Sequence, residues 1–198
     1  MAFKDNTALL LLDLQNEMTS PQGKVGAHGL AQQIAAGKVL ENAAAALAHA
    51  RREGHAVVHV RLGFRADYLD CLSVAPRIQK LKDNRAAIEG EWGTEFAPEV
   101  APNADELIIT KKCVNPFFNT GLMTWLMQNG IRSVVLSGVV TNLAVESTAR
   151  FADDAGFAVT VLKDACTAPN PAWHEFAVGQ ILPVFARVCE TADYAKGA

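Results

Sequence analysis

The sequence predicts an α/β fold, a three-layer sandwich with a mostly parallel, Rossmann-like sheet of five to six strands. Short apolar runs alternate with segments of helical pattern along the 198-residue chain. Repeated strand–helix units of this kind build right-handed crossovers over a parallel sheet. The runs are apolar at nearly every position, as is typical of strands that helices cover on both faces. The length favours a single domain over residues 1–198.

The first half of the chain is expected to hold two strands. The apolar run at 8–12 forms the first and is followed, after a polar loop, by a helix at about 30–52. That stretch is rich in alanine, the strongest helix former. The run at 56–60 forms the second strand, and a long loop and a helical piece at about 73–82 follow it.

The second half repeats a strand followed by a helix three times. The strands are expected at 107–110, 133–137 and 157–162, with a short last strand at 187–189. The intervening helices are expected at about 119–129, 142–155 and 171–182. Glycine directly after the first two helices and proline in the first turn of the third fit these boundaries.

Composition and charge exclude several classes of protein. The chain is 50% apolar and carries 18 basic and 21 acidic side chains, a formal net charge of −3. This balance offers no basic surface for nucleic acid, and the apolar runs are far shorter than the roughly 20 residues of a membrane span. We therefore expect no nucleic-acid or membrane partner. Four cysteines without paired or metal-ligand spacing indicate reduced thiols in a cytoplasmic protein.

Charged and turn-forming residues lie where two strands end. Ligands of such sheets bind beyond the carboxyl ends of the strands, where Asp13 ends the first strand and Lys111 the third. A desolvated carboxylate has a raised pKa unless a cation lies close, and Lys111 can supply that cation. The alternative is a structural ion pair. The segment 138–148 leads from strand to helix, and its backbone N–H groups suit an oxyanion or only a capped turn.

Three motifs make the chain, from Thr7 to about Cys189, resemble the isochorismatase-like cysteine hydrolases, which include nicotinamidases and N-carbamoylsarcosine amidases. The motifs are the strand that ends in Asp13-Leu-Gln15, the segment 109–120 around Lys111, and the segment 138–150. The resemblance implies that Asp13 is the general base and Lys111 the catalytic lysine. The nucleophilic cysteine of that family corresponds to position 144, which is alanine here.

Ala144 has no lone pair, so covalent catalysis by the family's route is impossible in this chain. None of the four cysteines is an obvious substitute: we expect Cys113 to point away from Lys111, and Cys166 to be a small buried hydrophobe. Three interpretations stay open. We favour a cysteine hydrolase from which the nucleophile was removed by design, because the surrounding motif is intact. The second is a natural non-catalytic binding relative, and the third is an isochorismatase-type vinyl-ether hydrolase that uses Asp13 as its acid.

The resemblance also implies how a substrate would be held. Backbone N–H groups of Val140 and of residue 144 would form the oxyanion hole, and the Val139–Val140 peptide bond is predicted to be cis. Side chains of the neighbouring loops would bind a small polar amide such as a carbamoyl acid or ureide. The candidates are Gln15, Arg65, Tyr68, Trp92 and Phe117.

No cofactor and no metal are expected. Nicotinamidases of the superfamily bind a metal through an Asp-x-His element, and no histidine follows Asp67 in the corresponding region. The helix at about 119–129 carries more apolar surface than one face needs, at Leu122, Met123 and Trp125 among others. Core packing explains this surface, or else a subunit interface does. With the resemblance, it favours a homo-oligomer, a dimer or tetramer.

Overall fold

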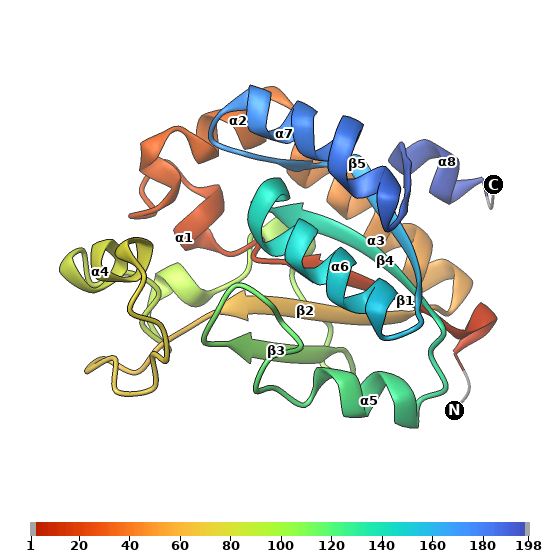
Figure 1. Ribbon diagram of the computed structural model, residues 1–198, viewed down its shortest axis with the longest axis horizontal. Helices are drawn as coiled ribbons and strands as arrows, with labels where there is room; N and C mark the ends of the chain where they lie inside the picture. Colours follow the sequence, from red (N-terminus) through yellow and green to blue (C-terminus); the bar gives the residue numbers. More distant parts are fainter. Residues whose placement is uncertain (1–2, 197–198) are drawn as a thin grey trace.

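Six strands form one parallel sheet in the computed structural model, which describes residues 3–196 (Figure 1). The strand order is β3-β2-β1-β4-β5-β6, the order of a Rossmann sheet. The strands are β1 (Thr7–Leu12), β2 (Ala56–Leu62), β3 (Leu107–Lys111), β4 (Ser133–Val139), β5 (Ala158–Thr167) and β6 (Arg187–Cys189). Each pair of neighbouring strands is parallel. The predicted fold class is confirmed.

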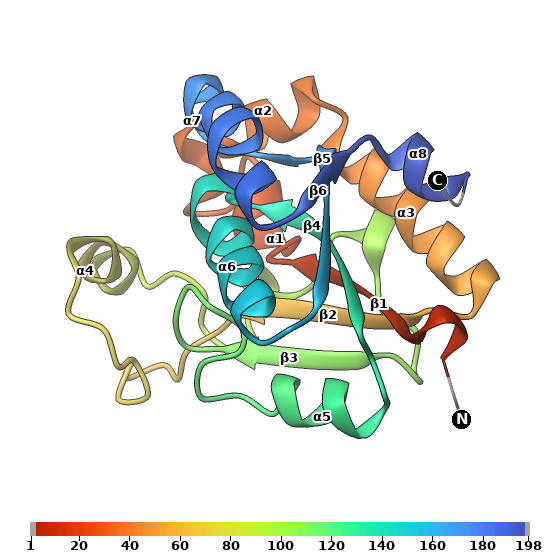
Figure 2. The ribbon, with the colours of Figure 1, turned by 45° about the vertical axis from the view of Figure 1, so that its right-hand side comes forward.

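Helices cover both faces of this sheet, as the apolar strands require (Figure 2). Side chains alternate along β1, so Leu9 and Leu11 face one layer while Leu10 and Leu12 face the other. The first layer holds α2 (Leu30–Ala36), α3 (Val39–Glu53) and α8 (Thr191–Ala195). The second holds α5 (Leu122–Gln128), α6 (Glu146–Asp154) and the helical segment that begins with α7 (Pro171–Phe176).

Two expected helices differ from the structure in their continuity. The helix expected at 30–52 is broken between α2 and α3, where Lys38 adopts a left-handed backbone with φ of 52°. Alanine on both sides favours helix but cannot prevent this break at Gly37-Lys38. The helix expected at 142–155 begins with a π-helical turn at Thr141–Val145, and α6 follows it. Within residues 3–196, no helix has the length and apolar character that crossing a membrane requires.

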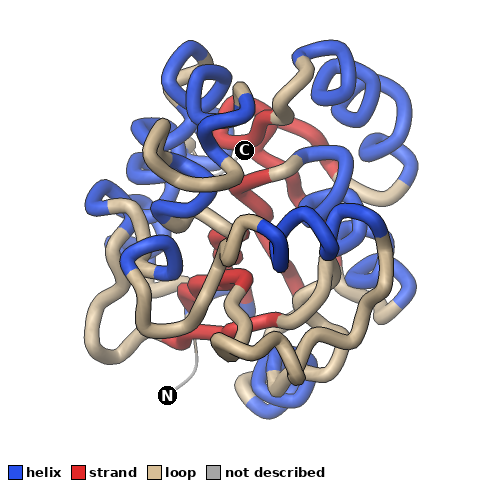
Figure 3. The backbone as a smooth tube through the Cα atoms, turned by 90° about the vertical axis from the view of Figure 1, so that its left-hand side faces the viewer, coloured by secondary structure: helices blue, strands red, loops and turns tan. Residues whose placement is uncertain are grey.

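Short helices and loops gather at the carboxyl edge of the sheet. Figure 3 faces this edge, and Figure 1 shows α4 (Pro76–Asp83) lying beyond the arrowheads of β2 and β3. The short helix α1 (Asn16–Thr19) directly follows β1. The ends of β1, β3 and β4 therefore open into a space that irregular segments enclose.

Most of the apolar side chains of α5 pack into the core. Leu122 and Leu126 are fully buried, and Met123 and Trp125 pack against the same core cluster. Met127 is 60% exposed. Core packing thus explains most of this helix, and the homo-oligomer stays a prediction.

Candidate active site

A buried ion pair joins the ends of β1 and β3. The Lys111 Nζ lies 2.6 Å from the Asp13 Oδ2, and the Lys111 side chain is 1% exposed. The ammonium also donates to the Val114 carbonyl oxygen over 2.8 Å. Burial raises the pKa of the Asp13 carboxyl, and the Lys111 charge opposes that shift. The second carboxylate oxygen, Oδ1, is buried without a hydrogen-bond partner among residues 3–196, so it is available to a ligand.

The turn after β4 carries position 144, which completes the candidate site beside Asp13 and Lys111. Gly138 pairs with Leu12 of β1 and has a φ of 130°, where a Cβ would clash with the Leu12 carbonyl oxygen. Glycine is therefore required for this close approach. The Val139–Val140 peptide bond is cis, as predicted. Ala144, in the π-helical turn that follows, is 4% exposed.

Two side chains hold this turn from outside. The Thr148 hydroxyl donates to the Ala144 carbonyl oxygen over 2.6 Å. The Thr141 Oγ1 lies 2.9 Å from Nδ1 of His174 in α7. Burial lowers the pKa of His174, so the imidazole is neutral near pH 7. The turn at position 144 is thus fixed to both α6 and α7.

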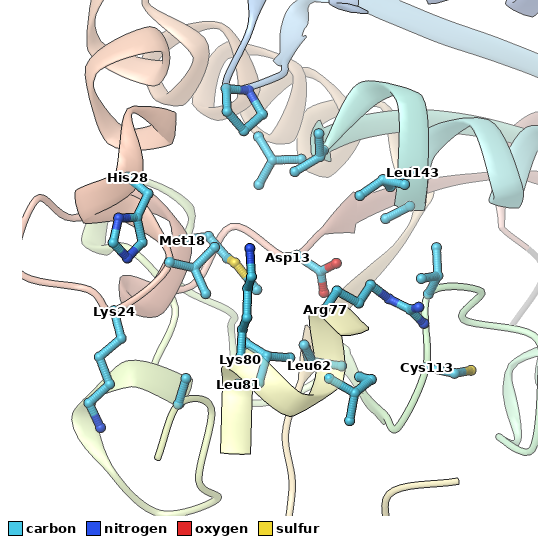
Figure 4. A pocket seen from close by; sticks show the side chains of 18 of the residues that line it. Asp13, Met18, Lys24, His28, Leu62, Arg77, Lys80, Leu81, Cys113 and Leu143 are labelled. Atoms are coloured by element: carbon cyan, nitrogen blue, oxygen red, sulfur yellow. The ribbon is translucent and has the colours of Figure 1, made fainter. Parts of the chain in front are cut away.

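Asp13, Lys111, Val140 and Ala144 line one cavity of about 590 Å³. Figure 4 shows the Asp13 carboxylate inside it, with side chains from several segments around it. The structure therefore brings together all four residues to which the sequence assigned the chemistry and the oxyanion hole. Such a volume lies within the range of about 300–1,000 Å³ that is typical of small-molecule sites.

Gln15 and Tyr68, two of the expected substrate-binding residues, lie outside the cavity wall. The Gln15 Oε1 accepts from the Leu62 backbone N–H over 2.7 Å, and its Nε2 donates to the Leu62 carbonyl oxygen over 3.0 Å. The Tyr68 hydroxyl donates to the Ala86 carbonyl oxygen over 2.7 Å. Both polar groups are thus engaged by backbone atoms, while Leu62 and Ala86 themselves line the cavity. These two side chains support the wall from behind.

The other three expected substrate-binding residues are also not among the cavity-lining residues. Arg65 pairs with Asp67 over 2.8 Å on the exposed surface. Trp92 is 48% exposed, and Phe117 is buried with its ring stacked on Phe151 at 4.7 Å. The structure does not bring these side chains to Asp13 and Lys111.

We predict that Gln15→Leu destabilises the fold. The change leaves the partly buried Leu62 N–H and carbonyl groups without their side-chain partner, which costs about 2 kcal/mol in the free energy of unfolding because each group loses a hydrogen bond. Urea unfolding followed by tryptophan fluorescence measures it. A variant of unchanged stability that binds ligand more weakly would instead assign Gln15 to the substrate.

The sequence did not predict the part of the cavity wall that lies beyond the strand ends. Arg77, Ile78, Lys80 and Leu81 of α4 line the cavity, and Lys24 and His28 do so from the loop after α1. The only signal for α4 was a short helical pattern at about 73–82. Neither that pattern nor the polar loop shows where the segment lies relative to the strand ends.

Cys113 is among the cavity-lining residues, and Figure 4 shows its sulfur pointing away from Asp13. The alternation of a strand does not extend to it, since β3 ends at Lys111. Burial raises the pKa of the Cys113 thiol, and its Sγ lies 3.2 Å from the Asn115 carbonyl oxygen. A protonated thiol is a weak nucleophile. Cys166 is buried as expected, and burial raises its pKa to about 12.

The described part of the chain, residues 3–196, contains no group of three or more histidine, cysteine, aspartate and glutamate side chains arranged to hold a metal ion. Position 67, where the resemblance made a metal element conceivable, carries an aspartate paired with Arg65. The expectation of a metal-independent site stays a prediction.

Known proteins resemble this chain over nearly its full length. The sequence pattern of the isochorismatase domain matches residues 7–193. The uncharacterized isochorismatase family protein YecD of Escherichia coli O157:H7 is 34% identical over 185 residues, which cover 92% of this chain and 90% of that protein. The ureidoacrylate amidohydrolase RutB of Methylorubrum extorquens strain AM1 is 30% identical over 203 residues, 96% of this chain and 82% of that protein.

Solved structures share the fold. N-carbamoylsarcosine amidase from Thermoplasma acidophilum superposes with a TM-score of 0.73 at 26% identity, covering 93% of this chain and 96% of that one. An isochorismatase-like hydrolase from Alkaliphilus metalliredigens superposes with a TM-score of 0.78 at 25% identity, covering 96% and 98%. The family match over residues 7–193 includes Asp13, Lys111 and Ala144.

Proposed function

The chain belongs to the isochorismatase family of hydrolases, and on this premise we propose that its site is built to hydrolyse a small amide, carbamoyl or ureide C–N bond. The chemistry is that of a Cys-Asp-Lys triad in which Ala144 occupies the nucleophile position. In this form the protein binds its substrate without turning it over. Relatives named ureidoacrylate amidohydrolase and N-carbamoylsarcosine amidase support the bond type.

The buried Asp13–Lys111 pair beside Ala144 is the observation that carries this proposal. A fully desolvated carboxylate and ammonium are costly to keep in a core, and hydrophobic residues of similar volume would often serve stability as well. Here the pair faces a cavity, and one carboxylate oxygen has no partner within the described residues. Such a perturbed group in a cavity is suited to proton transfer.

With a thiol at position 144, we propose the steps of a cysteine hydrolase. Asp13 accepts the thiol proton, and the thiolate sulfur attacks the carbonyl carbon. The C–N bond then breaks as Asp13 returns the proton to the leaving nitrogen, which leaves a thioester. Water attacks the thioester while Asp13 accepts its proton, and the C–S bond then breaks to release the acid as Asp13 returns that proton to the departing sulfur. Lys111 stabilises the charged form of Asp13 throughout.

Backbone donors at Val140 and residue 144 are proposed to bind the oxyanion that forms in both attacks. Each residue lines the cavity, and both lie on the turn that Thr148 and His174 hold in place. A preorganised donor of this kind is typically worth about 3 kcal/mol in the transition state. Alanine at 144 keeps the backbone donor, so ligand binding is retained when the sulfur is absent.

Substituting Ala144→Cys tests this function. Ammonia or amine release from a panel of small amides, carbamoyl acids and ureides is expected from the variant and not from the parent chain, because only the variant carries a nucleophile. Ala144→Ser is the matched control: its hydroxyl fills similar space but is far less nucleophilic. An Ala144→Cys variant that is folded yet inert across the panel would contradict the proposal.

The same experiment distinguishes this amidohydrolase from a binding protein and from a vinyl-ether hydrolase. Tight binding of a metabolite by the parent chain, together with an inert Ala144→Cys variant, would identify a natural binding protein. Turnover of isochorismate by the parent chain would identify a vinyl-ether hydrolase, for which the raised pKa of Asp13 would suit an acid catalyst.

Light scattering of the same samples tests the proposed dimer or tetramer.

A further inference from the structure

The cavity wall carries more positive than negative charge. Lys24, Arg77, Lys80 and Lys111 line it, whereas Asp13 is the one carboxylate among its described lining residues. Asp13 and Lys111 neutralise each other. Three cations therefore remain around the space in which a ligand would lie, two of them on α4.

Two of the three basic residues of α4 line the cavity, and neither has an acidic partner among the described residues. Within residues 3–196, no carboxylate forms an ion pair with Arg77 or Lys80. By contrast, Lys112 at the end of β3 pairs with both Asp70 and Glu89. Residues three apart in a helix lie on the same side of it, so Arg77 and Lys80 share the side of α4 that lines the cavity. Figure 4 shows both extending from α4, with the Lys80 ammonium and the Arg77 guanidinium on either side of Asp13 in this view.

Much of the remaining cavity wall is apolar. Met18, Val25, Leu62, Ile78, Leu81 and Leu143 line this part of the cavity. A carbamoyl group alone would leave most of the roughly 590 Å³ empty. Apolar lining that a ligand covers contributes favourable free energy in proportion to the buried area.

We propose that the ligand of this cavity is an amphiphilic acid: an amide or ureide group at one end, an apolar segment in the middle, and an anionic group at the other end that binds Arg77 and Lys80. This proposal rests on the proposed function for the position of the amide, beside Asp13 and residue 144. Arg77 can bind a carboxylate through two parallel N–H donors, and Lys80 adds a point charge. Both are specificity-determining residues in this proposal.

Lys24 has a lesser part in it. Its Nζ donates to the Arg85 carbonyl oxygen over 2.6 Å, which ties the loop after α1 to the segment after α4. The Glu17 carboxylate, 3% exposed, ties the same segments by accepting from the Ala87 N–H over 2.7 Å and from the Lys24 N–H. Lys24 thus joins two segments of the cavity wall, and we assign the anion to the cations of α4.

The test uses the parent chain, in which Ala144 prevents turnover during the measurement. The ligands are ω-ureido acids with an unbranched methylene chain of increasing length between the ureido group and the carboxylate. Each acid has a neutral counterpart in which a primary alcohol replaces the carboxylate. Isothermal titration calorimetry gives the dissociation constants. We expect the affinity of the acids to rise with chain length to an optimum, and the acid at that optimum to bind at least about tenfold more tightly than its alcohol.

Matched variants assign this preference to α4. Arg77→Met/Lys80→Met is expected to weaken binding of the optimal acid by about tenfold or more and to change binding of the alcohol by less than about twofold. Lys82→Met is the control, because Lys82 lies on the same helix but is not among the cavity-lining residues. It should leave both affinities unchanged. Methionine keeps the helix propensity of the replaced residues, and circular dichroism confirms that each variant is folded.

Three results would overturn the proposal: equal affinity for acids and alcohols, equal effects of Lys82→Met and the double substitution, or no binding of any acid. Turnover measured with the Ala144→Cys variant shows whether the ligand proposal or the proposed hydrolase function has failed. Hydrolysis of neutral amides with no preference for acids would refute the amphiphilic acid and keep the hydrolase. Acid binding that depends on Arg77 and Lys80, with no turnover of any compound, would refute the hydrolase and keep the ligand class.

Discussion

Replacing Asp13 with asparagine in the Ala144→Cys variant is expected to lower the rate of amide hydrolysis by about a thousandfold. Asparagine has nearly the same shape, but its amide cannot accept the thiol proton or return it to the leaving nitrogen. General acid–base groups typically contribute about 10²–10⁴-fold to a rate. Single-turnover release of ammonia, measured with saturating substrate, reports this chemical step.

The same substitution also affects folding, so a second variant is needed. Asp13→Asn leaves the Lys111 ammonium, 1% exposed, without its carboxylate, which costs about 3 kcal/mol in the free energy of unfolding. Asp13→Asn/Lys111→Met removes both charges and should recover much of that stability while staying inactive. Asp13→Asn that is folded and retains hydrolysis within about tenfold would show that Asp13 is not the general base.

The strand ends that carry this chemistry were predictable because burial on both faces leaves a clear pattern. The run Ala8–Leu12 is uniformly apolar up to Asp13, and a shorter apolar run followed by Thr110 leads to Lys111. In a parallel sheet such ends meet at one edge. Local pattern and a general rule of topology were therefore enough to bring Asp13 and Lys111 together.

The part of the cavity wall that α4 forms was not predictable, because a local sequence pattern does not show where a short polar segment lies in space. In α4 only Ile78 is buried, so its sequence gives a weak helical signal and no direction. Gln15 was misleading for a related reason. The sequence shows that its amide can donate and accept, but not that the Leu62 backbone at the end of β2 takes up both functions.

A second charged cluster, whose members are not among the cavity-lining residues, is expected to make stability fall in acid. Glu106, which precedes β3, accepts from the Nε of Arg51 over 2.7 Å and lies 2.9 Å from the Nε2 of His59. The Asn103 N–H donates to the same carboxylate over 2.8 Å. Against the cost of burial, these donors lower the pKa of Glu106 from 4.5 to about 2, and its side chain is 9% exposed.

The sign of the effect follows from these values. A carboxyl whose pKa is lower in the folded state stabilises the fold above its unfolded pKa of 4.5, and this contribution disappears as the pH falls toward about 2. The shift corresponds to about 3 kcal/mol. His59 acts in the same direction, because burial lowers its pKa and the unfolded chain binds the proton more readily as the pH falls below 6.5.

Glu106→Gln is therefore expected to reduce the free energy of unfolding by about 3 kcal/mol near pH 7 and by much less near pH 3. Urea unfolding across this range gives the difference between parent and variant, which cancels the titration of groups that do not contact Glu106. Asp67→Asn is the control, because the Arg65–Asp67 pair is exposed to solvent and contributes little. A difference for Glu106→Gln that stays constant with pH would show that the lost hydrogen bonds act without the charge. A difference that shrinks in acid for Glu106→Gln and is absent for Asp67→Asn would show that burial makes the Glu106 charge matter.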